Sequence, residues 1–115
     1  MRAVVMVAMV SAEAVRVAAV RETLAPFAWR SFTAESVGRR AVSALAGVGA
    51  FSGLPNSGGV REECADALVD FLGRWPWRSC AVDAVSRRLV GAAQAWHEER
   101  VWFDVRLGLL LDGAG

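Results

Sequence analysis

Residues 65–103 read ADALVDFLGRWPWRSCAVDAVSRRLVGAAQAWHEERVWF. This stretch carries a large apolar side chain at every seventh position on both sides of Pro76. A strict seven-residue repeat predicts an apolar helix face that supercoils with a neighbouring helix. Because the register survives the proline, we expect a kink in one continuous helix at Pro76 and not a break. The predicted apolar face, called the seam below, consists of Leu68, Phe71, Trp75, Val82, Val85, Leu89, Trp96 and Phe103.

The segment before this helix predicts a second helical arm. Residues 47–59, GVGAFSGLPNSGG, are a glycine-rich turn, with a first arm at about residues 11–46 and a second at about 60–107. Ser11 is the predicted N-cap of the first arm, and Thr33 is a second cap after the interruption at Pro26. No repeat other than the heptad is predicted. The expected fold is therefore all-α: one domain, residues 1–115, forming an antiparallel hairpin of two long helices.

The composition favours assembly with another chain. A second arm of this length would extend roughly 70 Å, which is too long for an interrupted first arm to cover. Hydrophobic residues make up 55% of the chain, which is hard to bury in so small a monomer. We therefore expect two hairpins to pair as a four-helix bundle.

Charge and hydropathy exclude two classes of partner. The formal net charge is +1, with 13 basic and 12 acidic residues, so no field attracts nucleic acid. The apolar run at residues 3–10 is too short to span a bilayer. Neither nucleic acid nor a membrane span is predicted, and the remaining expectation is a protein partner.

The residue types that carry chemistry are sparse. His97 is the single imidazole, with no motif to supply a nucleophile, and Glu98 and Glu99 are adjacent on a helix and so point in different directions. No catalytic, cofactor-binding or metal-binding residue is predicted. With Trp75 and Trp96 on the seam, the aromatic residues left for a surface are Trp29, Trp77 and Trp102.

The two cysteines are predicted to be small buried apolar residues. On one continuous helix, Cys64 and Cys80 would lie about 24 Å apart, beyond disulfide reach. A disulfide requires that the chain fold back at residues 73–76. A single histidine and the absence of a Cys-x-x-Cys pair give no metal-ligand pattern.

The turn and second arm, FSGLPNSGGVREECADALVDFLGRW and then RRLVGAAQAW, resemble the WXG-type (ESX-like) small helical-hairpin proteins of actinobacterial type VII secretion. Phe51 and Gly53 occupy the turn motif, where the family has Trp-x-Gly. Trp96 and Arg100 occupy the places of the aromatic and acidic residues of the family's export signal, so the export signal is degenerate.

The resemblance implies a non-enzymatic hairpin that is a pairing partner or substrate of type VII secretion. Its partner would be a second copy or a sister hairpin, beside a larger secreted effector. The alternative is an unrelated cytoplasmic helical adaptor or regulatory subunit. The sequence leaves both locations open, secretion through the type VII system and retention in the cytoplasm.

Overall fold

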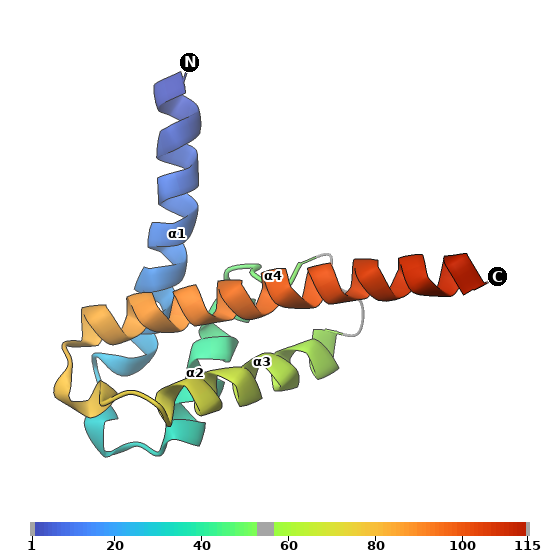
Figure 1. Cartoon of the computed structure of the whole chain (residues 1–115). Coiled ribbons are helices and arrows are strands. Elements are labelled where there is room, and N and C mark those ends of the chain that lie inside the picture. The colour runs from blue at the N-terminus through green and yellow to red at the C-terminus, as the bar shows by residue number, and fades with distance from the viewer. Residues whose placement is uncertain (1, 53–56, 115) are drawn as a thin grey trace.

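The computed structural model describes the backbone of residues 2–52 and 57–114 and the side chains of residues 12–52 and 59–100. All regular structure in these residues is helical, as predicted (Figure 1). The elements in chain order are helix α1 (Arg2–Leu24), a 3₁₀ turn (Trp29–Ser31), α2 (Ala34–Gly47), α3 (Ser57–Leu72), a second 3₁₀ turn (Trp77–Ser79) and α4 (Val82–Ala114).

Four α-helices in the described residues replace the two predicted arms, and the continuous helix through Pro76 was a wrong prediction. Helix α3 ends at Leu72 and α4 begins at Val82. Pro76 lies between them with φ −78° and ψ 63°, outside the helical region. Proline has no N–H to donate and restricts the residue before it, so the chain turns back here. Figure 1 shows α4 returning alongside α3.

The first arm is divided in the same way. Helix α1 ends at Leu24, shortly before Pro26, and α2 begins at Ala34. The predicted cap at Thr33 is confirmed, because its hydroxyl oxygen accepts the Ser36 N–H at 3.1 Å. The predicted cap at Ser11 was wrong, since α1 already begins at Arg2.

The chain contains an internal repeat that the sequence analysis missed. Residues 29–31 and 77–79 both read Trp-Arg-Ser, and the same offset of 48 residues joins Arg30 to Arg78. The offset continues through the next helix, where α2 and α4 share Val, Arg-Arg and Val at matching places. Identical pairs at this offset include Leu24 and Leu72, Val37 and Val85, Arg39 and Arg87, Arg40 and Arg88, and Val42 and Val90.

The backbone repeats with the sequence. Ala28 has φ −78° and ψ 61°, nearly the values of Pro76, and each residue precedes its 3₁₀ turn. In each turn the fourth residue donates its N–H to the tryptophan carbonyl at 3.1 Å, Phe32 to Trp29 and Cys80 to Trp77. The protein therefore consists of two equivalent units, each a helix, a 3₁₀ turn and a helix. They are called the N-unit (α1 and α2) and the C-unit (α3 and α4).

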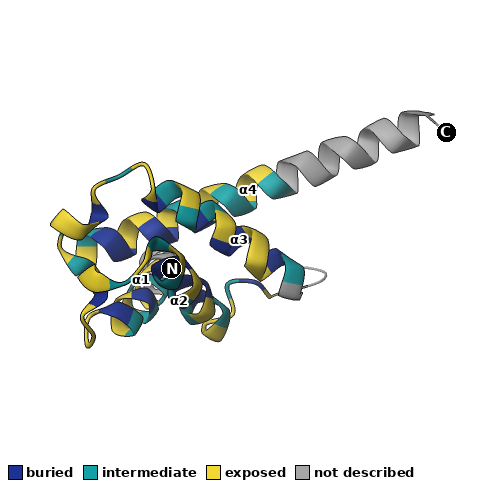
Figure 2. Cartoon of the chain, turned by 90° about the horizontal axis from the view of Figure 1, so that it is seen from below, coloured by how far each residue is buried: buried dark blue, intermediate teal, exposed yellow. Residues whose placement is uncertain are grey.

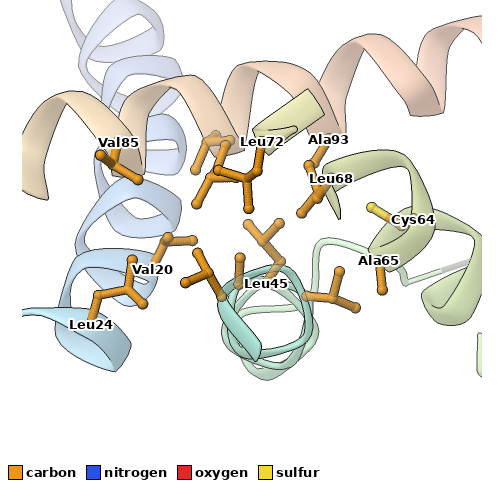
Figure 3. Packing of buried hydrophobic residues seen from close by; sticks show 14 of the residues in the cluster. Val20, Leu24, Leu45, Cys64, Ala65, Leu68, Leu72, Val85 and Ala93 are labelled. Carbon is orange, nitrogen blue, oxygen red and sulfur yellow. The ribbon is translucent and has the colours of Figure 1, made fainter. Parts of the chain in front are cut away.

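The two units share one hydrophobic core. Helix α1 packs on α2 and α4, and α3 packs on α2 and α4, so each unit contacts the other through both of its helices. Figure 3 shows Val20 and Leu24 of α1 directed toward Leu45 of α2, with side chains of α3 and α4 closing the other sides. Figure 2 shows buried and exposed residues alternating along the described parts of the helices. The largest fully buried side chains come from both units: Val20, Leu24, Val37, Val60, Cys64, Leu68, Leu72, Val85, Ser86 and Leu89.

Helix α2 ends in a glycine-dependent turn. Gly49 has φ 78°, a left-handed conformation that side chains disfavour. The Gly49 N–H donates to the Ala46 carbonyl at 3.1 Å, and the Ala50 N–H donates to the Leu45 carbonyl at 3.0 Å. This pattern is the Schellman motif, and it brings the following residue, Phe51, back into the core.

Candidate functional site

The two 3₁₀ turns meet through a reciprocal pair of arginines. Arg30 donates Nε–H to the Arg78 carbonyl at 3.0 Å and Nη2–H to the Cys80 carbonyl at 3.1 Å. Arg78 donates Nε–H to the Arg30 carbonyl and Nη2–H to the Phe32 carbonyl, both at 3.0 Å. Each guanidinium thus binds the opposite turn. The approximate twofold axis that relates the two units passes between Arg30 and Arg78.

Two tryptophans support this contact. The ring centroids of Trp29 and Trp77 lie 6.1 Å apart with the planes inclined at 30°. Arg30 lies over the Trp29 ring at 4.5 Å, and Arg78 lies over the Trp77 ring at 4.1 Å. Both tryptophans are buried, so the prediction that they serve an exposed surface was wrong. The four residues together are called the arginine clamp.

Beside the clamp lies a repeated pair of an aromatic ring and an arginine. In the N-unit, Arg40 lies over the Phe27 ring at 5.0 Å, and in the C-unit Arg88 lies over the Trp75 ring at 4.7 Å. Phe27 is 52% exposed, which is high for so large an apolar side chain. Trp75 is half-buried and packs on Phe71, with the ring centroids 5.6 Å apart.

We define the aromatic–arginine end as the clamp together with the Phe27–Arg40 and Trp75–Arg88 pairs. Its charge is positive. Arg74 forms an ion pair with Asp70 at 2.9 Å, but within the described part of the chain the guanidinium groups of Arg30, Arg40, Arg78 and Arg88 have no carboxylate partner. Ring faces and backbone carbonyls hold these cations, so their charge is available to an approaching anion.

The structure divides the predicted seam into buried and half-buried parts. Leu68, Val85 and Leu89 lie in the core of the chain itself. The half-buried members pack against that core, and they are Phe71, Trp75, Val82 and Trp96. Phe103 lies outside the described side chains. Because α3 is only 16 residues long, the length argument for a second copy does not apply to it.

The residues at the turn motif and at the export-signal position lie as follows. Phe51 is buried and meets Trp96 edge-on, with the ring centroids 6.5 Å apart. Gly53 lies outside the described residues. Arg100 forms an ion pair with Glu63 of α3 and lies over the Trp96 ring at 5.7 Å. The aromatic residues at the turn motif and at the export-signal position therefore lie against each other in the folded chain.

The remaining chemical groups are dispersed. No group of three or more His, Cys, Asp or Glu side chains that could hold a metal ion occurs in the described part of the chain. Cys64 and Cys80 are free thiols even though the chain folds back between them. Burial raises the pKa of the Cys64 thiol to about 11. Among the described residues, no helix is long and apolar enough to cross a membrane.

The residues of the aromatic–arginine end could have been found in the sequence. The repeated Trp-Arg-Ser at residues 29–31 and 77–79 marks the clamp, and Arg39-Arg40 with Arg87-Arg88 continues it at the same offset. A search for self-similarity shows this signal, whereas a search for heptads finds only the apolar positions.

Comparison with known proteins gave no match to the chain. No family model, no curated protein and no solved structure matches it. Its function is therefore argued from its own geometry.

Proposed function

We propose that the protein is a non-enzymatic helical adaptor that binds a protein partner through the aromatic–arginine end. The observation that carries this proposal is the pair of equivalent contacts Phe27–Arg40 and Trp75–Arg88, which present partly exposed rings under arginines. Aromatic residues and arginine are the types enriched at protein interfaces and at their energetic centres. The partner is expected to offer an acidic segment with apolar residues, because four guanidinium groups at this end have no carboxylate partner among the described residues.

The duplication suggests how the partner is held. The two units each carry an equivalent ring–arginine pair, so a partner with two equivalent segments could engage both at once. Simultaneous engagement raises the apparent affinity without any new type of contact. Because both units belong to one chain and the clamp joins their turns, the distance between the Phe27–Arg40 and Trp75–Arg88 pairs is fixed.

Site-specific photo-crosslinking in the producing cells tests this function. A photoreactive amino acid at Phe27 or Trp75 is expected to give the same discrete protein adduct, and Arg40→Glu and Arg88→Glu are expected to reduce it. The matched control is the same probe at Ser43, an exposed residue farther along α2. Adducts at positions 27 and 75 no stronger than at position 43, or unaffected by the charge reversals, would contradict the proposal.

The sequence resemblance gives a more specific second candidate. Under it, the chain is a pairing partner or substrate of type VII secretion, as the resemblance implies, and the partner is a second copy, a sister hairpin or a larger secreted effector. The distinguishing observation is location. The experiment compares a strain with an intact type VII system and a strain in which that system is inactivated. A secreted chain should appear in the culture filtrate of the first strain only, whereas a cytoplasmic adaptor or regulatory subunit should remain with the cells in both.

A further inference from the structure

A small cavity lies at the opposite end of α2 from the arginine clamp. It is partly open to solvent and is lined by α1, by the end of α2 and the turn after it, and by α4, and its volume is about 100 Å³. Its floor is apolar and is formed by the buried residues Leu45, Phe51, Val90 and Ala93. The aromatic–arginine end does not contribute to it.

Three polar side chains line the same cavity: Arg16, Gln94 and His97. Arg16 is half-buried and forms no ion pair or hydrogen bond within the described part of the chain. The Nδ1 atom of His97 is buried and has no hydrogen-bond partner there. No aspartate or glutamate lines the cavity, and the nearby Glu98 accepts a hydrogen bond from Gln94 at 3.2 Å. A cation and a buried imidazole nitrogen thus both lack partners beside an apolar floor.

The internal repeat shows that the fold does not require these polar groups. At the offset of 48 residues, the equivalents of Arg16, Gln94 and His97 are Cys64, Ala46 and Gly49. Within the floor, Leu45 and Ala93 correspond to each other at this offset, so this apolar pair recurs while the three polar residues do not.

We propose that this cavity binds a free short-chain monocarboxylate of two or three carbons. The carboxylate would accept hydrogen bonds from the Arg16 guanidinium and from Nδ1–H of His97, while the alkyl end lies on Leu45 and Val90. Arginine offers a fork of N–H donors that matches a carboxylate. A dry cavity of about 150 Å³ holds benzene, so about 100 Å³ accommodates an acid of about four or five non-hydrogen atoms.

The single histidine makes a direct test possible. In long-range ¹H–¹⁵N spectra the imidazole signals come from His97 alone, because the chain has one His. Titration with propionate at constant pH, with sodium chloride holding the ionic strength constant, is expected to shift the Nδ1 resonance saturably. A ligand of this size gains at most about 1.5 kcal/mol per non-hydrogen atom, and a Kd of about 1 mM is the expected order. The absence of a saturable shift up to about 100 mM, one hundred times that Kd, would overturn the proposal.

Matched ligands and variants separate the features of the site. Propionamide, which lacks the charge, and hexanoate, which is too long, are each expected to bind at least tenfold more weakly than propionate. Arg16→Gln is expected to weaken propionate binding at least tenfold, and Arg87→Gln, at an exposed position outside this cavity, should bind as the parent does, with circular dichroism confirming the fold of both. Equal binding of propionate and propionamide, or unchanged binding by Arg16→Gln, would overturn the assignment.

Discussion

Arg30 and Arg78 are bound to each other's backbone: Nε of each lies 3.0 Å from the carbonyl oxygen of the other. Neither the N-unit nor the C-unit can supply both halves of this contact, so it forms only when the two turns meet. The same geometry places a cation over each of two neighbouring tryptophans, whose rings are inclined at 30°. The clamp is therefore the contact that aligns the two units and, with them, the two partly exposed ring–arginine pairs.

Removing either clamp arginine should cost a similar amount of stability. Each guanidinium makes two hydrogen bonds to carbonyls in an exposed setting, so Arg30→Ala and Arg78→Ala are each expected to lower the free energy of unfolding by about 1–3 kcal/mol. Lysine at either position should not restore it, because one ammonium group cannot reproduce the fork. Urea denaturation measures the change, and Arg87→Ala, exposed and outside the clamp, should stay within about 0.5 kcal/mol of the parent. A cost confined to one of the two arginines would contradict the reciprocal role.

Gly38 permits close packing of α2 on α3. A Cβ at this position would lie 2.9 Å from Cγ2 of Val69 and 3.4 Å from the Ala65 carbonyl oxygen. Gly38→Ala is therefore expected to destabilise by about 1–3 kcal/mol, since overpacking forces the two helices apart. The control is Gly91→Ala on α4, where no atom lies within 4 Å of the added Cβ, and which should stabilise by about 0.5–1 kcal/mol through helix propensity. Thermal denaturation that shifts in the same direction for both variants would contradict this packing.

Ser86, the equivalent of Gly38 in the C-unit, has a buried hydroxyl with no hydrogen-bond partner among the described residues. Burying an unsatisfied hydroxyl costs about 1–3 kcal/mol, so Ser86→Ala is expected to raise the free energy of unfolding by about 1 kcal/mol. Chemical denaturation of the variant and parent measures this difference. A loss of stability would mean that the hydroxyl has a partner in solution.

Stability should decrease at alkaline pH because of Cys64. Its thiol keeps its proton in the folded chain up to pH about 11, whereas in the unfolded chain it ionises at its ordinary pKa. The folded state then binds more protons than the unfolded state, so stability falls as pH rises from about 9 to about 11, by at most about 1.4 kcal/mol per unit. The chain has no Tyr, and its 13 basic residues are all Arg, so few other groups ionise in this range.

Denaturation of Cys64→Ala and Cys80→Ala across this pH range isolates the contribution. The Cys64→Ala variant should lose most of the alkaline slope, although its stability at neutral pH is lower, and the Cys80→Ala variant should retain it. Thiol labelling of the native protein should likewise modify Cys80 well before Cys64, since the thiolate is the reactive form. Equal slopes in both variants would contradict the burial of Cys64.

The helical class could be predicted from the sequence because it depends on local signals. The hydroxyl of Thr33 caps α2 as expected, and Leu68 and Leu89 occupy the core as their spacing indicated. The number of helices could not be predicted from the heptad. Leu68 of α3 and Val85 of α4 keep a common register although a turn separates them, because both helices contribute to the same core.

The aromatic–arginine end was not predicted from the sequence, for a different reason. The arginines of the clamp bond to backbone carbonyls of the other unit, a contact that no local pattern shows. Cations on a helix are usually solvated, which made Arg40 and Arg88 inconspicuous. The repeat of Trp-Arg-Ser was the signal that related them, because equal sequences at a fixed offset predict equal structures that pack on one another.

A distance between spin labels on α3 and α4 tests the central claim, that the chain folds back at residues 73–76 to form two equivalent units. Labels at Glu63→Cys and Arg100→Cys, in a Cys64→Ala, Cys80→Ala background, replace two side chains that touch as an ion pair. We expect a separation below about 20 Å, because antiparallel packed helices lie within about 10 Å of each other and the labels add their own length. One continuous helix would place the labels about 55 Å apart, at 1.5 Å per residue, and that result would contradict the fold and the repeat together.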